Sequence, residues 1–84
     1  MVEGSAARPG DYWMTATVGE VFLIQRNYRD AARLYEAAVA MARKEIESHR
    51  STWKQACRLM EKLHPSNEQR SLVRRAFTHL PDCD

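Results

Sequence analysis

Glycine, proline and cysteine are all scarce in this chain of 84 residues, which holds three glycines, three prolines and two cysteines. Because glycine and proline interrupt helices, their scarcity leaves long stretches free to be helical. No apolar run approaches the roughly 20 residues of a membrane span, and the opening MVEGSAARPGDY lacks the apolar stretch of a secretory signal. We therefore expect a soluble, cytoplasmic protein of the all-α class.

The two cysteines, Cys57 and Cys83, differ in context, since one lies inside a periodic segment and the other stands next to the last residue. A disulfide framework is not expected for such a pair. The three histidines add possible ligands, but no pair of these residues has the close spacing of a zinc site. We predict no metal site and no cofactor, with Cys57 packed as a small hydrophobic residue.

Charge is distributed unevenly between the two halves of the chain. Residues 1 to 42 contain four basic and five acidic residues, whereas residues 43 to 84 contain nine basic and six acidic residues. The basic residues that could contact a nucleic acid are Arg50, Lys54, Arg58 and Lys62 on one helical ridge, with Arg74 and Arg75. Acidic residues interleave with them, so a solvated face is the favoured interpretation, and nucleic-acid binding is kept as the alternative function.

Helical periodicity follows a polar lead over residues 1 to 10, which we expect to be flexible. The first helix is predicted over residues 12 to 25. Asn27 then offers an N-cap for a second helix, with Asp30 in the first turn, where a negative charge is favoured. A link this short predicts an antiparallel hairpin over residues 12 to 48.

The boundary after the second helix is less clear, because the apolar stripe continues in phase through residues 28 to 63 and one helix remains an alternative. We place a break at residues 48 to 51, where Thr52 and Gln55 fit a capping box. Pro65 ends the third helix, and Ser66 with Gln69 starts a fourth, which Pro81 closes. The predicted domain thus covers residues 11 to 80, with a second hairpin over residues 51 to 80 and a short tail over residues 81 to 84.

Small and large apolar residues alternate across the first hairpin in an order that resembles a tetratricopeptide repeat. The residues that carry this resemblance, and that are predicted to pack the repeat, are Gly19, Phe22, Tyr28, Ala31, Tyr35 and Ala38. The chain departs from the motif at Arg26, where glycine is usual, and at Arg43, near where the second helix commonly ends. These departures suggest a longer second helix and a divergent repeat in an α-solenoid fragment.

A closer resemblance rests on DYWMTATVGEVFLIQRNY followed by STWKQACRLMEKL. These segments resemble the C-terminal part of the TRAF-binding domain of the apoptosis-signal-regulating MAP-kinase kinase kinases, a tetratricopeptide-like array with bacterial relatives. The matching positions are Tyr12, Trp13, Ala16, Thr17, Glu20, Tyr28, Ala31, Tyr35, Ala38, Ser51 and Gln55. The resemblance covers roughly residues 11 to 63 and implies a protein-binding scaffold without catalysis.

The predicted function is therefore a non-catalytic protein-protein interaction module. In a repeat hairpin the first helix lines the binding surface, which makes the candidate partner-binding residues Trp13, Ala16, Glu20, Leu23 and Ile24. We expect the partner to be a peptide, a protein helix or an adjoining repeat. Two hairpins are fewer than repeat arrays generally need for stability, so we expect the isolated chain either to be only marginally stable or to form a homodimer through the first hairpin.

Overall fold

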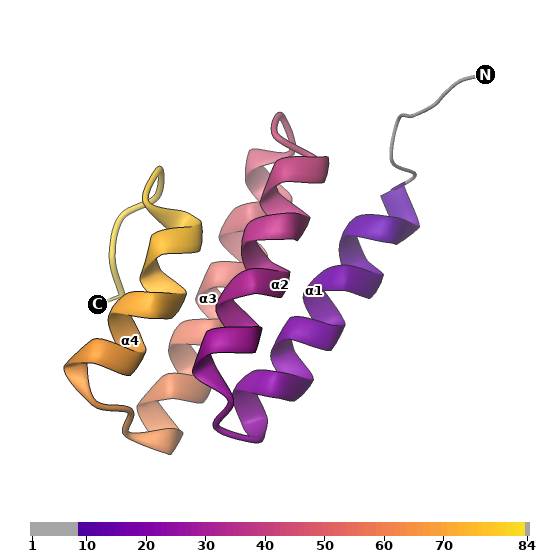
Figure 1. The fold of residues 1–84 in the computed structure, drawn as a ribbon. Coiled ribbons are helices and arrows are strands. Elements are labelled where there is room, and N and C mark those ends of the chain that lie inside the picture. The colour runs from indigo at the N-terminus through magenta and orange to yellow at the C-terminus, as the bar shows by residue number, and fades with distance from the viewer. Residues whose placement is uncertain (1–8, 84) are drawn as a thin grey trace.

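The computed structural model describes residues 9 to 83, which form four α-helices and one short 3₁₀-helix without any strand (Figure 1). The helices are α1 (Pro9–Ile24), α2 (Tyr28–Met41), α3 (Ile46–Leu63) and α4 (Asn67–Arg74), followed by the 3₁₀-helix η1 (Arg75–Phe77). The all-α class and the four helices are confirmed. Pro9 and Gly10 already belong to α1, and the rest of the predicted flexible lead lies outside the described residues. None of the helices within residues 9 to 83 has the length and apolar character that crossing a membrane requires.

Three of the predicted helix ends are formed by the residues that the sequence indicated. The side chain of Asn27 accepts a hydrogen bond from the backbone N–H of Asp30, which caps α2. Ser66 and Gln69 form the reciprocal capping box at the start of α4. His64 ends α3 in the left-handed conformation, with φ of 55°, immediately before Pro65. Local capping chemistry therefore sets these three boundaries.

The predicted break at residues 48 to 51 is wrong, because these residues lie inside α3 and the chain turns earlier, at residues 42 to 45. The hydroxyl of Thr52 donates to the carbonyl of Ser48 at 2.9 Å, so it bonds back within the helix and forms no capping box with Gln55. The ring Nε2 of His49 lies 2.8 Å from the carbonyl oxygen of Ala42, the C-cap residue of α2. A second helix longer than the repeat motif is likewise not observed, since α2 ends at Met41.

The fourth helix is shorter than predicted. It ends at Arg74 and tightens into η1, after which the chain turns back toward α3. The guanidinium of Arg74 donates to the carbonyl oxygens of Phe77 and Leu80, the latter at 2.7 Å. These bonds satisfy carbonyl groups that a continuing helix would have paired, so the turn needs no further helical residues.

The core lies where α2, α3 and η1 meet. The rings of Tyr35, Phe77 and Trp53 form a row, with centroids 5.4 Å apart between the first pair and 5.1 Å apart between the second. Five of the six positions named for repeat packing are buried, namely Gly19, Tyr28, Ala31, Tyr35 and Ala38, while Phe22 packs against the core from its edge. Burial raises the pKa of Tyr35, and the nearby Glu20 raises it further.

The two cysteines are joined in a disulfide, contrary to the sequence-based expectation. The bond ties Cys83, in the segment that follows η1, to Cys57 in the middle of α3. The indole N–H of Trp53 donates to the carbonyl of Pro81 at 2.9 Å and holds the same segment against α3. The pairing follows from the chain reversal after η1, which sequence spacing does not reveal. Residues 81 to 83 of the predicted tail are therefore fastened to the helical domain, and residue 84 lies outside the described range.

Candidate partner-binding surface

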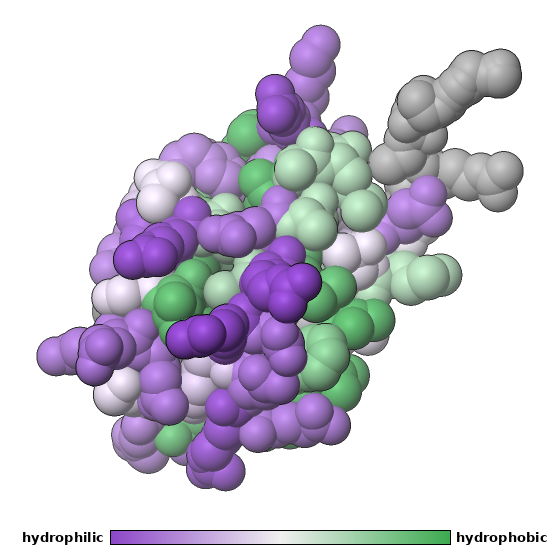
Figure 2. All heavy atoms as spheres, in the orientation of Figure 1, coloured by the Kyte–Doolittle hydropathy of each residue, from purple (hydrophilic) through white to green (hydrophobic). Residues whose placement is uncertain are grey.

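Helix α1 is apolar on nearly every side, so burying one face leaves another apolar face outside. Tyr12, Ala16, Gly19 and Leu23 recur at intervals of four and three and are buried against the rest of the domain. The opposite side exposes 47% of Trp13, 68% of Met14 and 52% of Ile24, together with Val18 and Val21. We call these five residues the outer face of α1. Figure 2 shows apolar side chains gathered over α1, at the right of the view.

Gly19 explains how closely α1 lies on α2. A β-carbon at this position would stand 3.2 Å from Cβ of Leu34 and 3.3 Å from the ring of Tyr35. These distances are already shorter than ordinary van der Waals contact, so a side chain well beyond a β-carbon, such as leucine, would push the helices apart. The glycine therefore fixes the rotation of α1 that turns the outer face outward.

Tyr12 fastens the other end of α1 to α3. Its hydroxyl lies 2.7 Å from the hydroxyl of Thr52 and 3.2 Å from the carbonyl oxygen of Ser48. Because the Thr52 hydroxyl donates to Ser48, the short contact is satisfied when Tyr12 donates to Thr52. Burial raises the pKa of Tyr12, and the hydrogen bond with Thr52 partly offsets that rise. Both ends of α1 are thus fixed, and its outer face is held in one orientation.

The structure separates the five candidate binding residues that the sequence grouped together. Trp13 and Ile24 lie on the outer face, whereas Ala16 and Leu23 are buried in the domain, with Leu23 fully inaccessible. Glu20 is half-buried between the two sides. The predicted five-residue binding face is therefore wrong as a set. The sequence reasoning missed Met14, Val18 and Val21, although their spacing of four and three residues was a readable signal of a second apolar stripe.

A buried histidine also joins α3 to the C-terminal segment. Only 1% of His49 is exposed, and its Nδ1 lies 2.9 Å from Nε2 of His79. A carbonyl oxygen can only accept, so Nε2–H of His49 donates to Ala42. When both rings are neutral, Nδ1 of His49 then accepts a hydrogen bond from Nε2–H of His79. Burial lowers the pKa of His79, and the charges of His49 and Arg74 lower it further. From the sequence, these histidines were considered only as possible metal ligands.

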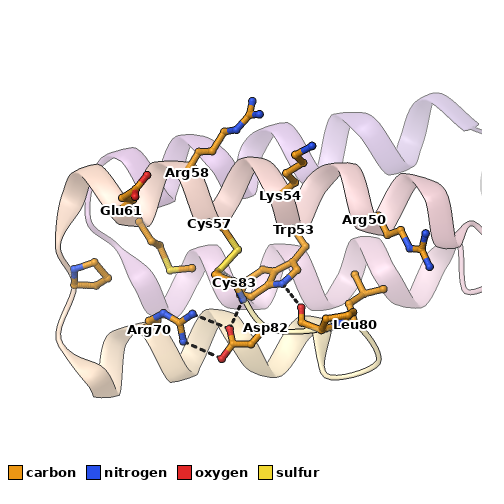
Figure 3. A pocket seen from close by; sticks show the side chains of 13 residues that line it. Arg50, Trp53, Lys54, Cys57, Arg58, Glu61, Arg70, Leu80, Asp82 and Cys83 are labelled. Carbon is orange, nitrogen blue, oxygen red and sulfur yellow. Dashed lines mark hydrogen bonds and ion pairs between the residues drawn. A yellow bond between two sulfur atoms is a disulfide. The ribbon is translucent and has the colours of Figure 1, made fainter.

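Apart from the outer face of α1, a concave surface lies between α3 and the C-terminal segment (Figure 3). It encloses about 680 Å³ and is bordered by the disulfide, by basic residues of α3 and by residues 80 to 83. We call it the α3 groove. Within residues 9 to 83, no three side chains of the histidine, cysteine, aspartate and glutamate types converge as a metal site would require.

Comparison of the chain with protein-family models, with curated proteins and with solved structures found no match. The tetratricopeptide-like and TRAF-binding resemblances therefore stay hypotheses that rest on the residues that carry them. A function has to be inferred from the chemistry of the two surfaces, the outer face of α1 and the α3 groove.

Proposed function

We propose that the protein is a non-catalytic protein-protein interaction module that binds its partner through the outer face of α1. The observation that carries this proposal is the row of five exposed apolar side chains along one helix. Monomeric soluble proteins rarely expose contiguous apolar patches larger than a few hundred Å², and larger ones mark interaction sites. Glu20 is the single charged residue between Tyr12 and Gln25, and its side chain is half-buried. The outer face therefore has no charged group that would favour its exposure to water.

We further propose that the four helices form two stacked hairpins of the tetratricopeptide type. Two packing relationships support this arrangement, because α1 packs on α3 as well as on α2, and α2 packs on α4. The turn between α1 and α2 supports it too. Arg26 adopts φ of 63°, a left-handed conformation that favours the glycine usual at this place in the motif. In such an array, the outer face of α1 is where a preceding hairpin would stack.

The partner that fits this face is a protein helix with an apolar stripe, and a second copy of this chain can supply it. The outer face carries no charge of its own, so two copies can meet across a two-fold axis without like-charge repulsion. Its side chains are spaced along one helix, which suits helix-on-helix packing. The large aromatic Trp13 at one end is the residue type that most often anchors interfaces.

Sedimentation velocity of the whole chain, from low to high micromolar concentration, tests this proposal. We expect a concentration-dependent dimer that Ile24→Glu shifts to monomer, because the substitution places a charge within the apolar face. Ile46→Glu is the matched control, since Ile46 is also exposed, at 39%, but lies at the start of α3. A monomer at every concentration, or equal weakening by both variants, would contradict self-association through this face.

Leu23 is not a useful variant for this purpose. Because it is fully buried in the core, Leu23→Ala would create a cavity and cost about 2 to 5 kcal/mol of stability whether or not the chain associates. Trp13→Ala is preferable as a second variant, since about half of Trp13 is already exposed in the monomer. Lys54→Ala, on another helix, should leave association nearly unchanged.

A cytoplasmic location stays a prediction. The Cys57–Cys83 disulfide counts against it, because disulfides are rare where thiols are kept reduced. Measuring the thiol content of the protein as isolated from cells, with alkylation during lysis, would decide between the two states. Two free thiols would favour the cytoplasmic assignment.

A further inference from the structure

The α3 groove is a second surface with a chemistry unlike that of the outer face of α1. The disulfide and the edge of Trp53 form its floor, and Leu80 and Pro65 also line it. Its volume of about 680 Å³ falls within the range of roughly 300 to 1,000 Å³ that is usual for binding pockets. The floor is therefore apolar and large enough to hold one or two side chains of a partner.

One border of the groove carries a regular row of cations. Arg50, Lys54 and Arg58 follow one another at four-residue spacing on α3, which places them about 6 Å apart along the helix axis. Arg50 also meets Glu47 in an exposed pair at 3.6 Å. Among residues 9 to 83, neither Lys54 nor Arg58 has an ion-pair partner, and Figure 3 shows both rising from the side of α3 away from Asp82. This border can therefore accept negative charge.

The opposite border is already neutralised and fixed. Asp82 accepts from Arg70 at 2.7 Å and lies 3.8 Å from Arg74. The hydrogen bond from Arg70 lowers the pKa of Asp82, so the carboxylate stays charged and paired. Among residues 9 to 83, the one further acid that lines the groove is Glu61, exposed at the end beyond Arg58. One side of the groove is therefore cationic, and the charges on the other side are paired with each other. Its two ends also differ, because Glu61 makes one end acidic.

We propose that the α3 groove binds a peptide segment that presents acidic side chains at helical spacing beside an apolar anchor. The regular spacing of the three cations favours a ligand with several negative charges over one with a single charged head. The apolar floor favours side chains over a bare phosphate backbone. Trp53 is 4% exposed, its ring stacks on Phe77 and the Arg74 guanidinium lies over it, so it offers no free ring on which a nucleobase could stack. This proposal concerns another surface than the proposed function and does not depend on it.

Fluorescence anisotropy with a labelled synthetic peptide of about 12 residues tests the proposal. The peptide carries glutamate at every fourth position and leucine on the adjoining face. A second peptide replaces each glutamate with glutamine, and a third probe is a single-stranded oligothymidine of equal length. We expect the glutamate peptide to bind at least tenfold more tightly than either of the other probes, with an affinity that falls as salt is added.

Two double variants with the same change in net charge locate the binding. Lys54→Glu with Arg58→Glu should weaken binding of the glutamate peptide at least tenfold, because like charges would then face each other. Arg43→Glu with Lys44→Glu, in the connection between α2 and α3, should change it less than threefold. All four positions are exposed, and thermal melting checks that both variants fold. Equal losses in both, equal binding of the glutamine peptide, or tighter binding of oligothymidine would each overturn the proposal.

Discussion

Helix α1 and the segment after η1 are both edges of the same small core, and they are finished in opposite ways. The C-terminal segment is covered by polar and covalent links: the disulfide, the Trp53 bond to Pro81 and the ion pairs of Asp82. The outer face of α1 is not covered by links of this kind, and its five apolar side chains are exposed. One edge is closed within the chain, and the other is left exposed.

This contrast separates what stabilises the fold from what is available for binding. Links at the C-terminal edge add stability without exposing apolar surface. The outer face of α1 contributes little to the monomer, because side chains that stay half-exposed on folding gain only part of their transfer free energy. We expect substitutions at the two edges to act on different measurements, melting temperature on one side and association on the other.

Removing the disulfide should have the largest effect on stability. Closing a loop of 26 residues stabilises a fold by about 3.5 kcal/mol in the chain-entropy account. The double variant Cys57→Ser with Cys83→Ser should therefore melt well below the oxidised protein, as should the wild-type chain treated with a dithiol. The dithiol should have no effect on the double variant. Dimer formation through α1, measured at a temperature where the variant is folded, should not change.

An unchanged melting temperature on reduction would contradict the view that the C-terminal edge is the stabilising one. The hydrogen bond from Trp53 and the ion pairs of Asp82 would then suffice to hold the segment. Loss of association on reduction would contradict the separation of the two edges, since the disulfide lies on α3, away from the outer face of α1.

Gly19→Leu should have the next largest effect, at the α1 edge. A β-carbon there already comes within 3.2 to 3.3 Å of Leu34 and Tyr35, so a leucine would push α1 from α2 at a cost of about 1 to 3 kcal/mol or more. Gly10→Leu is the matched control, because a β-carbon at Gly10 meets nothing within 4 Å. Thermal melting compares them. Equal melting temperatures for the two variants would argue against the close helix contact and against the repeat-type packing proposed for it.

How much of this contrast was readable from the sequence depends on the range of the interactions. Local signals worked: the caps at Asn27 and Ser66 and the stop at Pro65 all act within a few residues. Gly19 and Tyr35 were also readable, because helical spacing places them on one stripe. The all-α class and the helix count followed from these signals.

What the sequence did not reveal depends on contacts between distant segments. The turn at residues 42 to 45 contains no glycine or proline, and its one distinctive partner is the ring of His49, seven residues from Ala42. Residues 48 to 52, with the sequence SHRST, are poor in helix formers. They nevertheless lie in α3, where they form hydrogen bonds with Tyr12 and His79. The disulfide depends on a chain reversal that spacing cannot predict. The five candidate binding residues do not share one face, because the apolar residues of α1 form two stripes and the predicted set took residues from both.

A smaller effect is expected from pH at the C-terminal edge. The pKa of His79 is lowered from its ordinary value of 6.5, so the folded state resists a proton that the unfolded chain accepts. The stability contributed is complete above pH 6.5, and is lost as pH falls below that value toward the folded-state pKa. His79→Gln should flatten the melting temperature in this window. The contribution of Asp82 is separable, because its lowered pKa places the corresponding loss below its ordinary value of 3.8. If the melting temperature of the wild type, but not of His79→Gln, rose as the pH was lowered from 6.5 to 5, it would contradict the lowered pKa of His79.

The smallest expected change is a gain at the turn between α1 and α2. The N–H of Asn27 donates to the carbonyl of Phe22, and that of Arg26 donates to Leu23, so Arg26 occupies the left-handed position of a Schellman motif. Glycine adopts this conformation without the steric cost that a side chain has, and Arg26→Gly should raise stability by about 0.5 to 1 kcal/mol. Arg33→Gly, in the exposed middle of α2, should lower it by about 1 kcal/mol, because there glycine only adds conformational freedom to the unfolded chain. Denaturant titration of both variants measures the two signs. A loss of stability in both would mean that the positive φ of Arg26 is compensated by its surroundings, and the resemblance of this turn to a repeat turn would lose its energetic basis.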